Sequence, residues 1–301
     1  MKRAQPIHGK PARLDVAAAA PISRKPRRVT SAMAARIIAS PVGGEYNDAV
    51  RDRRSLMALP PAEFAAALLR EATDTHPWLH HRLFRMIWDG QLTSSQLRDV
   101  IRQQGAFFLD TLRHAAWKII SVGGELPTFE DLERQRTLIP LVVEEGGEDT
   151  IGGKTTAHAY LFIRLAESLG ISRDELFTTD YLPTTLIEKH ELFLLQRSST
   201  IEALCGGNIA TESINPIHMR RMAEAMEKHY GVSRGALDFY YVHMAVEDEH
   251  ADRAVKILDT IAVTDAEQAR GRLALRRAIT ARRICADGML EAFVGGHRAN
   301  P

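Results

Sequence analysis

Apolar residues recur three and four positions apart from Pro60 to near the end of the chain, which is the spacing of one face of an α-helix. Prolines, glycines and capping residues divide this pattern into segments. There is no sustained alternation of apolar and polar residues, and no Asn-Gly or Asp-Gly turn is flanked by strand-like runs. The sequence therefore predicts an all-α domain in which about seven to nine helices form a bundle.

The predicted helices begin and end at ordinary capping and breaking signals. A long helix is expected to open at Thr93, an N-cap residue, and to run with Leu112 and Ile119 in its core stripe as far as Gly123-Gly124. One further helix is expected at about residues 129–145, interrupted by glycines and resuming over 155–169, and others at about 61–75, 79–88, 183–196, 199–213, 216–229, 235–261 and 265–292.

Composition excludes several classes of protein. Of 301 residues, 45% are hydrophobic and 26% charged, which is ordinary for a globular domain, and the net charge of +1 favours neither nucleic acid nor a membrane surface as a partner. The two cysteines, Cys205 and Cys285, are too few for a disulfide framework, so we expect a cytoplasmic protein. No apolar run is long enough for a membrane span.

The first part of the chain differs from the rest. In the first forty residues, nine lysines and arginines stand against a single acid, Asp15, and Ala17–Ala20 and several prolines lie between them. Such a segment buries too little apolar surface to offset its chain entropy. We therefore predict a disordered basic tail over residues 1–45 and a single helical domain over residues 46–301. The same composition is compatible with a transit peptide.

One predicted helix carries a stripe of metal-ligand residue types. His243, Glu247 and His250 lie within roughly 60° of one another on a helical wheel, and neighbours at this spacing have Cβ atoms ~5–6 Å apart. Imidazole and carboxylate together suit iron, manganese or zinc better than calcium or magnesium. A solvent-facing polar stripe has the same spacing, so a metal site requires further ligands from other helices.

Other elements supply such residues in a recognisable order. Glu145 is followed by Gly146-Gly147, and His158 opens the next helix. Glu212 lies alone on a later helix, before the His243 stripe. The ferritin-like template, which needs two Glu-x-x-His pairs, is only half matched. The order of these elements over about residues 70 to 260 instead resembles the heme-oxygenase-like diiron oxidases and oxygenases.

This resemblance implies a heme-oxygenase-like bundle, two Fe(II) ions as cofactor and O₂ as cosubstrate. The implied ligands are Glu145, His158, Glu212, His243, Glu247 and His250. Glu247 stands where the family usually has Asp, which adds one methylene between backbone and metal. The glycine-rich connection before His158 also leaves Glu144 and Glu148 as alternatives to Glu145. A seventh ligand is open, and Asp110 is the acid on the third helix that could supply it.

The resemblance further implies an enzyme of specialised metabolism. We expect oxidation of a small amino acid or related amine by desaturation, N-oxygenation or oxidative cleavage. An external electron donor and a homodimer are both compatible with this, whereas nucleic acid and membrane are not expected partners. Side chains that could bind an amino-acid head group are Gln103, Gln104, Arg134, Tyr160 and Lys189.

Three other functions compete with this hypothesis. A thiaminase II-like hydrolase has the same fold and would use Cys205 as its nucleophile, although a free Cys is more often simply packed in a core. A cofactorless oxidase of the pyrroloquinoline-quinone synthase type would need basic substrate-binding residues in place of a metal set. A helical adaptor would use the last helix, whose apolar residues Leu273, Leu275, Ile279 and Ile284 alternate with arginines.

Overall fold

The computed structural model describes residues 58–123, 126–148, 150–151 and 154–295, and within residues 148–155 and 245–250 it describes no side chains. The predicted tail over residues 1–45 lies outside this part of the chain, so the tail and its boundary stay predictions. The described helices belong to one unit spanning residues 56–301.

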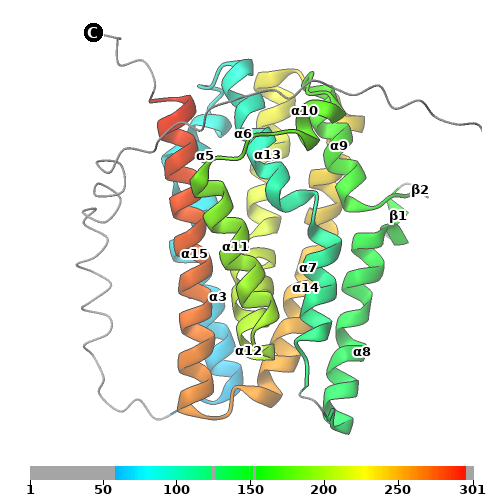
Figure 1. Cartoon of the computed structure of the whole chain (residues 1–301), viewed down its shortest axis with the longest axis vertical. Coiled ribbons are helices and arrows are strands. Elements are labelled where there is room, and N and C mark those ends of the chain that lie inside the picture. The colour runs from blue at the N-terminus through cyan, green and yellow to red at the C-terminus, as the bar shows by residue number, and fades with distance from the viewer. Residues whose placement is uncertain (1–57, 124–125, 149, 152–153, 296–301) are drawn as a thin grey trace, which may run out of the picture. The chain divides into compact units, whose positions relative to one another are not determined.

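The predicted all-α class is confirmed. Nine helices of ten or more residues are described: α3 (Pro61–Thr75), α6 (Ser94–Phe108), α7 (Thr111–Ile120), α8 (Phe129–Val143), α9 (His158–Ser168), α11 (Pro183–Arg197), α13 (Asn215–Tyr230), α14 (Asp238–Ile261) and α15 (Asp265–Phe293). They run mainly alongside one another, as Figure 1 shows.

Shorter elements connect these helices. They are α4 (Pro77–His80), α5 (Arg82–Trp88), α10 (Arg173–Phe177), α12 (Thr200–Ala203) and the 3₁₀ turn η3 (Arg234–Ala236). The kinked turn η1 (Glu144–Glu148) follows α8 directly, and the π-helix η2 (Leu204–Glu212) follows α12 directly. A pair of two-residue antiparallel strands, β1 (Thr150–Ile151) and β2 (Lys154–Thr155), precedes α9, where no strand was expected.

Capping residues fix several of the boundaries. Thr93 and Gln96 form a capping box that starts α6, and Thr264 and Glu267 form another that starts α15. At the end of α13, Gly231 adopts φ +67°, a left-handed conformation that glycine takes without a Cβ penalty. These helices begin or end within a few residues of the positions that the sequence predicts.

The long helix predicted from Thr93 to Gly123-Gly124 is wrong, because α6 ends at Phe108 and α7 begins at Thr111. The break changes which face of α7 is buried. Leu112, expected in the core, is 46% exposed. The buried residues of α7 are instead Thr111, His114, Ala115 and Lys118. A polar face of α7 therefore points into the bundle.

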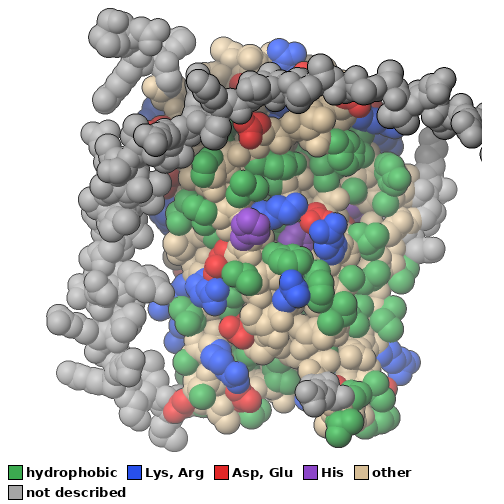
Figure 2. Space-filling view, in the orientation of Figure 1, with side chains coloured by type: hydrophobic (Ala, Val, Ile, Leu, Met, Phe, Trp, Pro, Cys, Tyr) green, Lys and Arg blue, Asp and Glu red, His purple; other side chains and the backbone are tan. Residues whose placement is uncertain are grey.

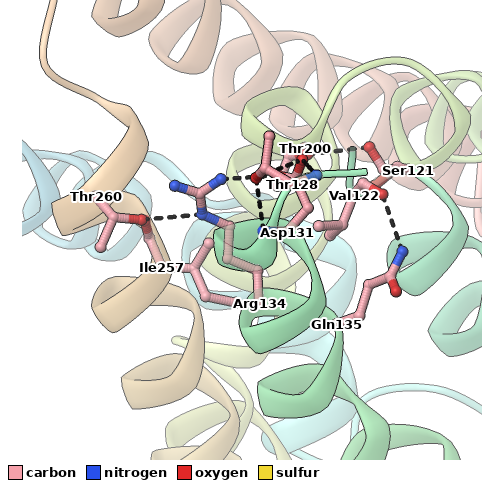
Figure 3. A network of polar contacts seen from close by, with 9 residues as sticks. All are labelled: Ser121, Val122, Thr128, Asp131, Arg134, Gln135, Thr200, Ile257 and Thr260. Atoms are coloured by element: carbon pink, nitrogen blue, oxygen red, sulfur yellow. Dashed lines mark hydrogen bonds and ion pairs between the residues drawn. The ribbon is translucent and has the colours of Figure 1, made fainter. Parts of the chain in front are cut away.

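A network at one end of the bundle fixes the start of α8 (Figure 3). Arg134 donates hydrogen bonds to Asp131 on its own helix at 2.8 Å and to Thr260 of α14 at 3.2 Å. Gln135 donates to the carbonyl of Val122, just after α7, at 3.1 Å. Arg134, considered from the sequence as a substrate-binding residue, thus ties α8 to α14.

Three helices meet at a cluster of aromatic rings in the core. Phe108 of α6, Phe162 of α9 and Phe239 of α14 pack with ring centroids 4.9–5.2 Å apart. Such edge and tilted contacts stabilise beyond the area that they bury. The ring of His243, one turn after Phe239, lies 4.5 Å from it, so the cluster fixes the position of that imidazole.

On the outer face shown in Figure 2, basic, acidic and apolar side chains are interspersed.

Candidate metal centre

The two carboxylates expected from different helices lie on irregular segments: Glu145 in the turn η1, where Gly147 breaks the helical geometry, and Glu212 at the end of the π-helix η2. A π-helix inserts an extra residue per turn and so changes which side chains point inward, and such segments are frequent at functional sites. Neither the kink at η1 nor the π-helix at η2 was predicted, because the apolar residues around both segments recur with the spacing of an ordinary α-helix.

Gly147 shapes the connection between Glu145 and His158. Its φ of +107° is strained for any residue with a side chain, and a Cβ there would lie 2.6 Å from the backbone nitrogen of Ala157. The chain after α8 therefore passes directly against the start of α9, and Glu145 comes close to His158.

Glu145, His158 and His243 form a cluster in which one potential ligand atom of each residue lies within 4.8 Å of the others. Nδ1 of His158 is 3.1 Å from Oε2 of Glu145, and the rings of His158 and His243 have centroids 4.5 Å apart. Both histidines are buried. Nδ1–H of His243 donates to the carbonyl of Phe239 at 2.6 Å, which leaves Nε2 as the nitrogen able to bind a metal.

The electrostatics of this cluster favour an ionised carboxylate. Burial by itself would raise the pKa of Glu145, but the neighbouring His158 and His243 hold that pKa at about 2. The cluster thus offers one carboxylate and two imidazoles, shielded from bulk water.

Glu144, the sequence alternative to Glu145, is held elsewhere. Arg253 of α14 donates to both of its oxygens, at 2.8 and 3.0 Å. Asp110, considered as a seventh ligand, pairs with Arg113 at 3.1 Å and Lys189 at 3.4 Å. Glu148 lies outside the described side chains, so that alternative is untested.

Glu212 lines the same cavity as Glu145 and His243 but does not belong to the three-residue cluster. Its Oε1 is 2.5 Å from Nζ of Lys118, and its Oε2 accepts a hydrogen bond from the amide of Asn208.

The side chains of Glu247 and His250 lie outside the described residues, and only their backbone on α14 is placed. They follow His243 by one and two helical turns, as predicted from the sequence. Their ligation stays a prediction.

The cavity beside the cluster has a polar wall on α7 that was not predicted. Thr111, His114 and Lys118 all line it. Nδ1 of His114 contacts Oε1 of Gln196, and burial lowers the pKa of His114 to about 4, so the ring is neutral. Its Nε2 is buried without a hydrogen-bond partner among the described residues. The spacing of these residues at i, i+3 and i+7 is a helical face, which becomes visible once the break before Thr111 is known.

Comparisons with known proteins identify the family of this chain. A family model described as "iron-containing redox enzyme" matches residues 107–283, which includes the described cluster and α7. The chain belongs to this family. The resemblance found in the sequence is thereby confirmed at the level of the family. No curated protein is detectably similar in sequence.

Solved structures show that this family member has the heme-oxygenase-like fold. A domain of unknown function with that fold from Shewanella denitrificans has a TM-score of 0.57 and 14% identity, covering 79% of this chain and 94% of the other. A TenA homologue from Pseudomonas syringae pv. tomato has a TM-score of 0.62 and 13% identity, covering 78% and 98%. A CADD-like protein of unknown function from Nostoc punctiforme has a TM-score of 0.62 and 17% identity, covering 77% and 97%.

The residues present fit the iron that characterises the family. Imidazole and carboxylate are the usual protein ligands of non-heme Fe(II), and Glu145, His158 and His243 bring them together in a buried position.

None of the described helices is both long and apolar enough to cross a membrane.

Other sequence candidates lie away from this cluster. Cys205 is fully buried, burial raises the pKa of its thiol, and it packs against α15, where a Cβ on Gly271 would lie 2.9 Å from Sγ. Gln103, Gln104 and Lys189 line a second cavity, which shares Phe107 and Phe108 with the first. Tyr160 is 62% exposed.

Proposed function

We propose that this iron-containing redox enzyme is a non-heme diiron oxidase or oxygenase that uses O₂ to oxidise a small amino acid or related amine. The observation that carries the proposal is the buried cluster of Glu145, His158 and His243 beside a cavity that Glu212 also lines. Together with Glu247 and His250, these residues would hold two Fe(II) ions. Bound Fe(II) would donate electrons that activate O₂, and the activated O₂ would oxidise the substrate.

The surroundings of the cluster support a reaction shielded from water. Phe107, Phe108 and Leu141 line the cavity and keep its wall apolar on one side. Excluding water strengthens the electrostatic interactions inside such a site and protects reactive species from side reactions.

The polar wall on α7 supports an amine or amino acid as substrate. The free lone pair on Nε2 of neutral His114 can accept a hydrogen bond from a substrate N–H group. Thr111 adds a hydroxyl that can donate or accept. Desaturation, N-oxygenation and oxidative cleavage, as in specialised metabolism, all fit such a site. An external electron donor and a homodimer belong to the same proposal.

Thiaminase-like hydrolysis has less support. The TenA name belongs to a structural neighbour of low identity, which establishes only the shared fold. Cys205 is buried and does not line the cavity, and a raised thiol pKa makes its thiolate scarce. A cofactorless oxidase would leave the carboxylate–imidazole cluster without a role.

The test is to load the protein anaerobically with Fe(II), add O₂ and a panel of amino acids and their amines, and follow oxygen uptake and product masses. Substrate-dependent uptake that is lost in His243→Ala and kept in Cys205→Ser is the expected result. Thiamin cleavage without metal that disappears in Cys205→Ser would replace this proposal with the hydrolase.

A further inference from the structure

Glu212 is held by a buried ammonium group. Lys118 of α7 and Glu212 at the end of η2 form an ion pair of 2.5 Å, and their side chains are only 7% and 12% exposed. Asn208, one turn earlier on η2, donates its amide to the other carboxylate oxygen. Both oxygens of Glu212 are therefore already hydrogen-bonded by this protein's own side chains.

Glycines in η2 leave room for this pair. A Cβ on Gly207 would lie 3.1 Å from Cε of Lys118, closer than ordinary packing allows. A Cβ on the adjacent Gly206 would lie 2.8 Å from Leu195 of α11. The glycine pair lets the methylene chain of Lys118 cross the π-helix closely and lets η2 pack against α11.

Burial makes the two partners depend on each other. A buried ammonium or carboxylate is costly unless it is paired, and removing one partner leaves the other charge uncompensated. Lys118 thus compensates the negative charge of Glu212, which a metal ion would otherwise do. Two cations beside the same carboxylate repel each other strongly at low dielectric.

We propose that Lys118 is an internal counter-ion that occupies Glu212 and makes the metal position containing Glu212 the weaker of the two. This inference rests on the proposed function, because it takes Glu212 as a ligand. A metal ion bound at Oε1 of Glu212 would displace Lys118 from that oxygen. The position formed by Glu145, His158 and His243 involves no such displacement, so the two positions fill in sequence.

The experiment measures metal binding without turnover. Wild type and Lys118→Met are titrated anaerobically with Fe(II) by calorimetry and with Mn(II) by electron paramagnetic resonance, which counts free and bound ions. The variant is expected to bind its second ion about tenfold or more tightly, because the competing charge is gone. Affinity for the first ion is expected to change little.

Two matched variants control for charge and for the ligand. Lys228→Met removes the same charge from an exposed lysine in the last turn of α13, and it should leave both affinities unchanged. In Lys118→Met with Glu212→Gln, the gain at the second position should disappear.

A further variant keeps the test valid if Lys118→Met does not fold. Lys118→Gln retains a hydrogen-bond donor for Glu212 without the positive charge. Its affinity for the second metal ion should rise, as in Lys118→Met. Unchanged or weaker second-ion binding in the folded variants would overturn the inference and leave the metal centre standing. If no variant, wild type included, binds any ion above a non-specific background, both the inference and the proposed function are wrong.

Discussion

Nδ1 of His158 lies 3.1 Å from Oε2 of Glu145, although a glycine-rich connection of twelve residues separates the two. Gly147 produces this contact, because its backbone conformation and close approach to Ala157 turn the chain back onto α9. The cluster of Glu145, His158 and His243 therefore depends on a residue that carries no side chain.

Gly147→Ala should weaken metal binding and destabilise the protein by about 1–3 kcal/mol, because a Cβ there combines a strained φ with a contact of 2.6 Å. Gly146→Ala is the matched control, since its nearest neighbour would be Leu112 at 3.9 Å, an ordinary contact. Thermal unfolding and Fe(II) titration of both variants provide the measurement. Equal effects would show that Gly147 has no special role.

Glu145→Gln should lower affinity for the first metal ion by more than the roughly 10–100-fold typical of losing an outer hydrogen-bond partner. Glu144→Gln breaks the pair with Arg253 and should leave metal affinity largely intact. Anaerobic calorimetry distinguishes the two. The reverse ranking would assign the ligand role to Glu144.

On α14, His243→Ala and Glu247→Ala should each abolish tight metal binding, whereas Glu247→Asp, which restores the family's usual residue, should preserve it. Asp248→Ala and Glu249→Ala lie off the predicted stripe and are controls. Circular dichroism checks that helicity is kept. Uniform loss across the controls would mean that the helical-face argument does not apply to this segment.

The metal-free protein should lose stability in mild acid. Burial lowers the pKa of His114 to about 4 and that of His218 to about 3, and it lowers the pKa of His76 well below its usual value. Below about pH 6.5 the unfolded chain binds protons that the folded chain does not, so stability is full above that pH and falls as pH decreases toward the folded pKa values. Each histidine lowers the free energy of unfolding by up to about 1.4 kcal/mol for each pH unit of acidification in this range.

Urea unfolding at pH 7.5, 6 and 5 measures this dependence. His218→Gln, which can still donate to the carbonyl of Trp78, should have a smaller pH slope than the wild type. An unchanged slope would exclude His218 as a contributor.

Local signals predicted much of the fold because caps and breakers act within a few residues. The helix expected at 265–292 is α15 at Asp265–Phe293, since Thr264 caps it. The break before Thr111 was missed because neither Leu109 nor Asp110 is a glycine or proline, and the contact of Asp110 with Lys189 of α11 is not visible in the sequence. The Lys118–Glu212 pair was also missed, since 94 positions separate its members.

Helical spacing pointed to His243, and the resemblance to the heme-oxygenase-like diiron enzymes pointed to Glu145 and His158; the described structure places these three together. What the sequence could not supply was the shape of the segments that carry them. Gly146-Gly147 was visible as a helix breaker, whereas Gly206-Gly207 lies inside the helix predicted over residues 199–213. In the structure, Gly147 kinks the chain against Ala157, and Gly206 lets the π-helix η2 pack against Leu195.

The central claim is a two-iron centre, and the most direct test is to load the protein anaerobically with ⁵⁷Fe(II), remove free metal, and measure iron per chain together with the Mössbauer spectrum. We predict two high-spin Fe(II) ions per chain under saturating metal, the second bound more weakly, and conversion of both to coupled Fe(III) after O₂ is added. One iron per chain at saturation, or only non-specific iron with no defined Mössbauer signal, would contradict the account.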